Sequence, residues 1–180
     1  FVSAQVGSEL AERGALAMVV ALLMIFVYVM IRFQWKFSAG AVAALMHDAI
    51  VTLGFFSVFG LPFDLTVVAA VLAVIGYSLN DTVVAFDRIR ENFLNLRGIP
   101  AEEAMNISIN EMLARTLITG LTTLLVLVAL LVLGGESIAP FSIALIVGII
   151  VGTYSSIYTA SATALMLDVN PQDLIEPVKD

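Results

Sequence analysis

The chain has 180 residues, 61% of them hydrophobic and 13% charged, with a mean hydropathy of +1.05 and a formal net charge of -7. A soluble domain is about half apolar and about a quarter charged, so this composition excludes an ordinary soluble globule and makes lipid the expected solvent. The acidic balance offers no basic surface for nucleic acid. The absence of cysteine excludes disulfides and cysteine-based metal sites, and one histidine excludes most other metal sites, so no metal and no cofactor are expected.

Five apolar stretches have about the 20 residues that a helix needs to cross a bilayer. They cover residues 14–31, 38–59, 66–86, 116–133 and 141–167. Short connections follow the second and the fourth stretches, so the helices that they join must run antiparallel. We therefore predict an all-α fold, a polytopic membrane bundle of five transmembrane helices over residues 14–167.

A longer polar connection, residues 87–115, separates the third stretch from the fourth. Within it, Pro100 precedes Glu102 and Glu103. This order is typical of a helix start, because proline fits the first turn and acidic side chains favour the positive end of the helix dipole. We expect a separate interfacial helix over residues 100–113.

Basic residues gather on one side of the membrane if every apolar stretch crosses it. The residues on that side are Arg32, Lys36, Arg88, Arg90, Arg97 and Lys179, whereas Arg13 lies on the other side. Cytoplasmic segments of membrane proteins carry an excess of lysine and arginine. We therefore expect the connection 87–115 and the C-terminal tail, residues 168–180, in the cytoplasm and the N-terminus outside.

Asp81 is the most unusual charged residue, because it lies inside the third stretch with Asn80 beside it. A charge near the centre of a bilayer is unfavourable by at least about 2.5–3.5 kcal/mol on insertion scales, so it needs an explanation. Two explanations stand. The carboxylate either snorkels or caps near the cytoplasmic end of its helix, or it is a buried titratable group on an ion path.

Arg115 opens the fourth stretch, and threonines follow it along one helix face. Thr119 lies one turn further on, and Thr122 and Thr123 lie two turns further on. The spacing predicts one polar stripe on an otherwise apolar helix. Arg115 either anchors the helix end at the membrane surface or points inward toward Asp81.

Asp48 lies in the middle of the second stretch, where small or polar residues recur every four positions as Gly40, Ala44, Asp48 and Thr52. Small residues let helices approach closely in lipid, where packing and interhelical hydrogen bonds stabilise a bundle. Asp48 is either a hydrogen-bonding group on that face or a second protonatable site. His47, about 100° around the helix, is expected to be a packed or interfacial residue rather than a relay.

The fifth stretch has the same four-residue interval of small side chains. They are Gly148, Gly152, Ser156 and Ala160. We expect close helix packing along this face.

Several of these polar residues stand in runs that resemble one family of membrane proteins. The run Gly-Tyr-Ser-Leu-Asn-Asp-Thr-Val-Val-Ala-Phe-Asp-Arg-Ile-Arg-Glu-Asn, residues 76–92, resembles the signature of the SecF family, the smaller membrane subunits of SecD–SecF protein-export complexes. Further similarity lies in His47-Asp48 with the following Ala-Ile-Val-Thr-Leu-Gly, in Arg115-Thr-Leu-Ile-Thr119 with the following Gly-Leu-Thr-Thr, and in Gly152-Thr-Tyr-Ser-Ser-Ile-Tyr. The resemblance covers nearly all of residues 7–167.

SecF proteins normally have six spans, with a periplasmic domain between the first and the second. The resemblance implies that this chain is a fragment that lacks the first span and that domain. Residues 1–13 would be an extracytoplasmic lead-in from the missing domain, and the five stretches would be the family's second to sixth spans. The N-terminus deduced to lie outside agrees with this assignment.

The resemblance also implies a fold related to the resistance-nodulation-division (RND) transporters and a role in a bacterial cytoplasmic, or inner, membrane. That role is to couple the proton-motive force to protein translocation, with SecD, the SecYEG translocon and exported preproteins as partners. It maps proposed proton-path residues onto Asp81 and Arg115, with Thr119 as a neighbouring polar position. Asn80 and Asp48 complete the proton relay that we predict, and no enzyme activity is expected.

Three other interpretations are weighed against this one. Intramembrane aspartyl proteases also use two aspartates on successive helices, but Met-His-Asp48 and Leu-Asn-Asp81 lack the Tyr-Asp and Gly-x-Gly-Asp contexts of such enzymes. A small-molecule RND exporter would be far longer, with large extramembrane domains. A purely structural scaffold subunit stays open, because a sequence shows where a charge lies and not whether it titrates.

Overall fold

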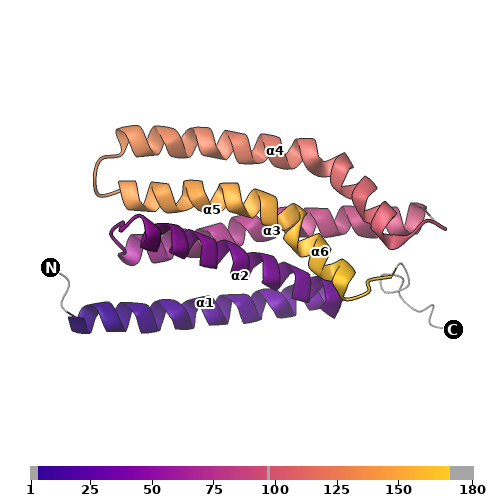
Figure 1. Cartoon of the computed structure of the whole chain (residues 1–180), viewed down its shortest axis with the longest axis horizontal. Helices are drawn as coiled ribbons and strands as arrows, with labels where there is room; N and C mark the ends of the chain where they lie inside the picture. The colour runs from indigo at the N-terminus through magenta and orange to yellow at the C-terminus, as the bar shows by residue number, and fades with distance from the viewer. Residues whose placement is uncertain (1–3, 97, 171–180) are drawn as a thin grey trace.

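The computed structural model describes residues 4–96 and 98–170. Its helices in chain order are α1 (Ala4–Arg32), α2 (Trp35–Val58), α3 (Leu65–Asn95), α4 (Ala101–Leu133), α5 (Ala139–Ile157) and α6 (Thr159–Met166). The described ranges contain no strand. The five long helices lie side by side in alternating directions, and α6 continues α5 after a change of direction (Figure 1). All five are long and apolar enough to cross a membrane, α5 together with α6, so the predicted five-helix bundle is confirmed.

The predicted interfacial helix over residues 100–113 is not a separate element. It forms the first part of α4, a continuous helix of 33 residues that bends in this first part (Figure 1). Residues 101–119 contain neither proline nor glycine, so nothing in the chain interrupts the helix where the polar segment meets the apolar one. Because α3 also extends to Asn95, the polar connection is mostly helical and α3 and α4 continue together beyond the apolar stretches.

Small residues set the closest helix contacts, as their four-residue spacing predicts. A Cβ at Gly40 of α2 would lie 2.5 Å from the carbonyl oxygen of Ala160 in α6. A Cβ at Gly148 of α5 would lie 2.8 Å from Val74 Cγ1 in α3. Only glycine fits at both positions, so the bundle depends on these residues to bring α2, α3, α5 and α6 together.

Aromatic rings fill the end of the bundle where α1 turns into α2. The rings of Phe37 and Phe86 are 4.8 Å apart and nearly perpendicular, and Phe33 makes a similar edge contact with Phe86 at 5.8 Å. Such T-shaped pairs stabilise beyond the area that they bury. They join the start of α2 to the middle of α3.

The two outer helices expose most of their apolar surface. Only 6% of the most apolar window of α1 and 17% of that of α4 are buried within this chain, against 44% for α3. Exposed leucine, valine and isoleucine side chains on such a scale need lipid or another protein around them. The outward faces of α1 and α4 are therefore the surfaces through which the bundle contacts lipid or another protein.

Asp64 caps the start of α3 in the short connection after α2. Its Oδ1 accepts hydrogen bonds from the backbone N–H groups of Thr66 at 2.8 Å and Val67 at 3.1 Å, and from the Thr66 hydroxyl at 2.6 Å. These donors, the Thr66 hydroxyl foremost, lower the pKa of Asp64 below its ordinary value of 3.8. The capped helix start orients the third span.

Replacing Gly40 by alanine should lower the free energy of unfolding by about 1–3 kcal/mol, the usual cost of overpacking, because the Ala160 backbone cannot rotate away. Gly54→Ala in the same helix is the matched control, since nothing lies within 4 Å of its Cβ position and alanine favours a helix. Thermal unfolding of the purified protein in detergent measures both. Equal stability of the two variants would contradict the close contact of α2 with α6.

The Asp64 cap should make stability depend on pH at the acidic end. The folded-state pKa is depressed, so the stabilisation is fully present above the ordinary pKa of 3.8 and is lost as the pH falls through the lowered value. Asp64→Asn keeps the cap without the charge and should flatten this dependence, whereas Asp64→Ala should cost about 1 kcal/mol at neutral pH. Unfolding curves of the three proteins between pH 7 and acid test this, and identical pH profiles would refute it.

Candidate functional site

Asp48 lies at the centre of the bundle, where α2, α3 and α5 meet. Its side chain is fully buried, and its Oδ2 accepts a 2.7 Å hydrogen bond from the Ser78 hydroxyl of α3. Gly152 of α5 packs over this pair, since a Cβ there would lie 3.2 Å from Ser78 Cβ and 3.3 Å from the same carboxylate oxygen. Asp48 is thus a hydrogen-bonding group on a packing face, and its role as a protonatable site stays a prediction.

His47 contributes to the same centre from beside Asp48. Its Nδ1 lies 3.3 Å from Asp48 Oδ1, and 38% of its side chain is exposed. The ring is therefore packed at the edge of the bundle, as expected, and it reaches the carboxylate from there.

Asp81 lies in the same helix as Ser78, one turn further on, and has a different environment. Its residue exposure is 7%, and its Oδ2 has no hydrogen-bond partner in the described part of the chain. An unpaired carboxylate oxygen in a buried site is energetically unfavourable. It is stabilised when a proton, a water molecule or a mobile cation binds to it. The sequence left two explanations for Asp81: a carboxylate that snorkels or caps the helix end, or a buried titratable group. This geometry agrees with the second.

Arg115, the predicted partner of Asp81, lies on the neighbouring helix α4. Among the residues that the structure describes, no ion pair within 4.0 Å joins the two side chains. Arg115 is exposed and borders a cleft between α3 and α4 of about 410 Å³. In the described part of the chain, Arg115 therefore lies at the cleft and is not paired with Asp81.

The cleft is lined mainly by charged side chains from both helices. Across it, Arg88 Nε donates to Glu111 Oε2 at 2.6 Å, and Asn92 Nδ2 donates to the same oxygen at 2.8 Å. Arg88 also pairs with Glu91 on its own helix at 2.6 Å. The cleft thus contains acidic side chains, other than Asp81, with which Arg115 can pair.

The remaining predicted relay residues do not join a buried site within this chain. Asn80 and Thr119 are exposed. The Thr119 hydroxyl donates to the carbonyl oxygens of Arg115 and Thr116, both at 3.0 Å, so it is satisfied within its own helix. Of the predicted stripe, only Thr123 reaches another helix, at 3.4 Å from the Tyr77 hydroxyl.

Sequence reasoning missed the partners of the buried carboxylate and the contacts across the cleft. Serine is common in membrane helices, so Ser78 carries little signal by itself. The spacing of three residues between Ser78 and Asp81 was the available clue, since it places both on one side of α3. Nothing in the sequence pairs Arg88 with Glu111, which come from different helices. The described residues contain no group of three or more potential metal ligands.

Comparisons with known proteins agree on one family. The family model described as "Protein export membrane protein SecD/SecF, C-terminal" matches residues 1–170. The chain is 53% identical to the protein translocase subunit SecF of Pseudomonas aeruginosa over 177 residues, which cover 98% of this chain and 58% of that protein. It is 48% identical to SecF of Escherichia coli O157:H7 over 176 residues, which cover 98% of this chain and 54% of that protein. The chain thus spans little more than half the length of these curated relatives.

A solved structure supports the same assignment. The crystal structure of SecDF from Thermus thermophilus, described as a translocon-associated membrane protein, is similar to the bundle with a TM-score of 0.85 and 45% sequence identity. The match covers 92% of this chain and 23% of that chain.

Removing the Ser78 hydroxyl should destabilise the bundle, because Ser78→Ala leaves the buried Asp48 carboxylate without its closest donor. The expected loss is about 1–3 kcal/mol of unfolding free energy. In an Asp48→Asn background the same substitution should cost less, with a coupling of at least about 0.5 kcal/mol. Unfolding of the two single variants and the double variant gives this coupling, and strictly additive effects would show that the hydrogen bond does not hold α2 to α3.

Proposed function

The chain belongs to the SecD/SecF C-terminal family of protein export membrane proteins, and on that premise we propose that it is the membrane part of a SecF-type translocase subunit. In this proposal it couples the proton-motive force to protein translocation together with SecD. The observation that carries the proposal is Asp81, a carboxylate buried within a spanning helix with an unpaired oxygen. A buried ionisable group of this kind marks an ion path in membrane proteins.

Asp81 and Arg115 together provide a two-state element. Burial disfavours the charged carboxylate and a neighbouring cation favours it, so small movements change which form is stable. In the charged form Asp81 attracts Arg115. In the protonated form that attraction is lost, and Arg115 turns to the acidic side chains of the cleft, where a counter-charge is already in place. Proton binding is thereby linked to the separation of α3 and α4.

The membrane potential is large enough to drive such a change. One elementary charge that crosses 100 mV gains about 2.3 kcal/mol, which shifts a two-state equilibrium by more than tenfold. Asp48, with its hydrogen bond from Ser78, is the second candidate carboxylate of the relay. Asn80 and Thr119 are exposed on this chain and belong to the relay in this proposal only if the partner subunit covers them.

The orientation in the membrane follows from charge. The turn after α1, the connection between α3 and α4 and the end of α6 lie at one end of the bundle (Figure 1). Arg32, Arg88 and Arg90 are also at this end, as is Lys36, whose ammonium donates to the Asp168 carbonyl oxygen at 2.8 Å. By the positive-inside rule we assign this end, and with it the C-terminus, to the cytoplasm of a bacterial inner membrane.

A scaffold role is the second candidate, and the apolar faces of α1 and α4 favour it. Most of both helices is uncovered within this chain, as expected for a subunit that docks on a partner. SecD is the partner proposed for these faces, and the SecYEG translocon and exported preproteins are proposed to act on the assembled complex. A scaffold would need Asp81 for assembly, whereas a coupling subunit needs it for the response to the gradient.

Asp81→Asn in the full-length subunit, assembled with SecD in sealed vesicles, should abolish the stimulation of protein export by a proton gradient while the amount of complex stays normal. The amide keeps the shape of the side chain and loses the titrating proton. Asp64→Asn is the matched control, because it removes a carboxylate at the other end of α3 and keeps the helix cap. Gradient-stimulated export at the wild-type level would remove Asp81 from the coupling mechanism, and loss of the complex would favour the scaffold.

A further inference from the structure

The charged cleft between α3 and α4 offers Asp81 a route to water. Val84, Arg88 and Glu91 line it from α3, and Glu111 and Arg115 line it from α4. Its volume of about 410 Å³ has room for several water molecules, and its charged walls supply the polar partners that such waters need.

Asp81 lies on the helix face that lines this cleft. It precedes Val84 by three residues and Arg88 by seven, and at 3.6 residues per turn both spacings keep the residues on one side of α3. Its Oδ2 is the one carboxylate oxygen in the described part of the chain that is buried without a hydrogen-bond partner. Only 7% of the residue is exposed, and the cleft begins one helical turn away at Val84.

One set of contacts runs between α3 and α4 at the cleft. Glu111 Oε2 of α4 accepts from Arg88 Nε at 2.6 Å and from Asn92 Nδ2 at 2.8 Å. Asn92 in turn donates to the buried Ser108 hydroxyl at 3.0 Å, which fixes the amide. By contrast, the 2.6 Å pair of Arg88 with Glu91 stays within α3, and Asp87 pairs with Arg32 of α1.

We infer that this cleft is the hydrated mouth through which protons pass between Asp81 and the water at the α3–α4 end of the bundle, and that the Arg88–Glu111 contact closes it. The inference rests on the proposed function, because it describes how the same carboxylate exchanges its proton. When Arg115 moves toward the cleft it competes with Arg88 for Glu111, so the state of Asp81 is transmitted to the closing contact. The arrangement links proton release to opening of the mouth.

The test uses single cysteines, since this part of the chain has none of its own. Val84→Cys is placed in the full-length subunit, free of other cysteines and assembled with SecD in sealed vesicles. A charged, membrane-impermeant thiol reagent is added on the side of the α3–α4 connection. Val84→Cys should react, because water reaches the cleft and a thiolate forms there. Leu117→Cys, on the opposite side of α4 from Arg115 and 52% exposed in this chain, is the apolar control and should not react.

Two substitutions then separate the closing contact from a change in net charge. Glu111→Gln removes the ion pair between the helices and should raise the labelling rate of Val84→Cys by about two- to fivefold, the effect of losing an exposed ion pair. Glu102→Gln removes an equal charge from the start of α4, outside the cleft, and should leave the rate unchanged. No labelling of Val84→Cys in any background would overturn the hydrated mouth, and equal rates with both substitutions would overturn the closing role of Glu111.

The labelling assay does not depend on export. Failure of the inference therefore appears as an unreactive Val84→Cys, whereas failure of the proposed function appears as normal gradient-driven export by Asp81→Asn.

Discussion

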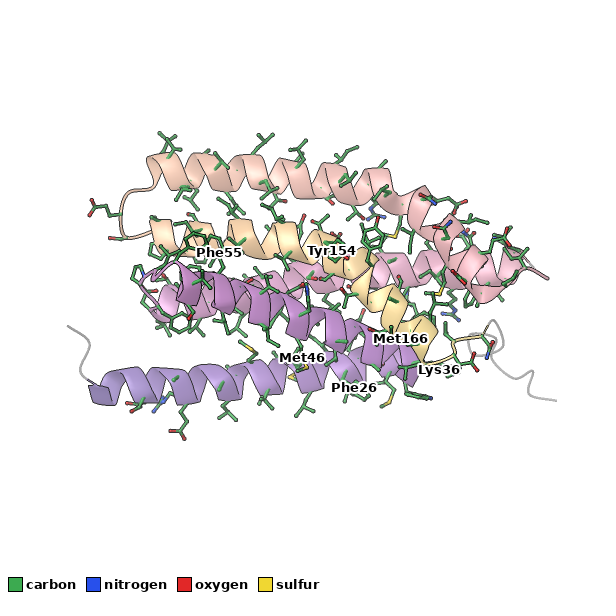
Figure 2. All side chains as sticks on the ribbon, viewed as in Figure 1. Phe26, Lys36, Met46, Phe55, Tyr154 and Met166 are labelled. Atoms are coloured by element: carbon green, nitrogen blue, oxygen red, sulfur yellow. The ribbon has the colours of Figure 1, made fainter. Side chains whose placement is uncertain are left out.

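The contact of α2, α3 and α5 around Asp48 holds the rest of the bundle in place. In lipid, burial of apolar surface gives little driving force for helix association, so close packing and interhelical hydrogen bonds must supply it. Gly152 lets α5 approach until its backbone covers the Asp48–Ser78 hydrogen bond. One turn earlier, Gly148 lets α5 pack closely against Val74 of α3. With these three helices fixed, α1 and α4 pack on the outside and leave apolar side chains facing outward, as the side chains along both helices show (Figure 2).

The two membrane aspartates have different surroundings. Asp48 accepts a hydrogen bond from the Ser78 hydroxyl of a neighbouring helix, which suits a group that stabilises one arrangement. Asp81 has an unpaired oxygen and a charged cleft on its side of the helix, which suits a group that changes its partner. A fully satisfied buried carboxylate favours rigidity, whereas an unsatisfied one makes the site sensitive to protons, water and movement.

The candidate site residues can be recognised in the sequence because a charged side chain is unusual within an apolar segment. Asp81, Arg115 and Asp48 were identified in this way, and the four-residue spacing of glycines predicted the faces that pack. The prediction of a separate helix before the fourth span was wrong, since the change from polar to apolar residues after Arg115 looked like a boundary although the backbone has no break there. Ser78 and Glu111 could not be identified, because their importance lies in what they touch on another helix.

The sequence by itself determined the solvent of this protein, the number of its long helices and their alternating directions, since about 20 apolar residues can only cross a bilayer as a helix and short connections reverse the chain. Only the tertiary structure decided how each helix is rotated about its axis. Spanning helices are apolar on nearly every side, so no hydrophobic stripe defines an inner face. Rotation is set instead by glycine contacts and buried polar pairs between distant segments, and this rotation left Asn80 and Thr119 outside while it buried Asp81 beside a charged cleft.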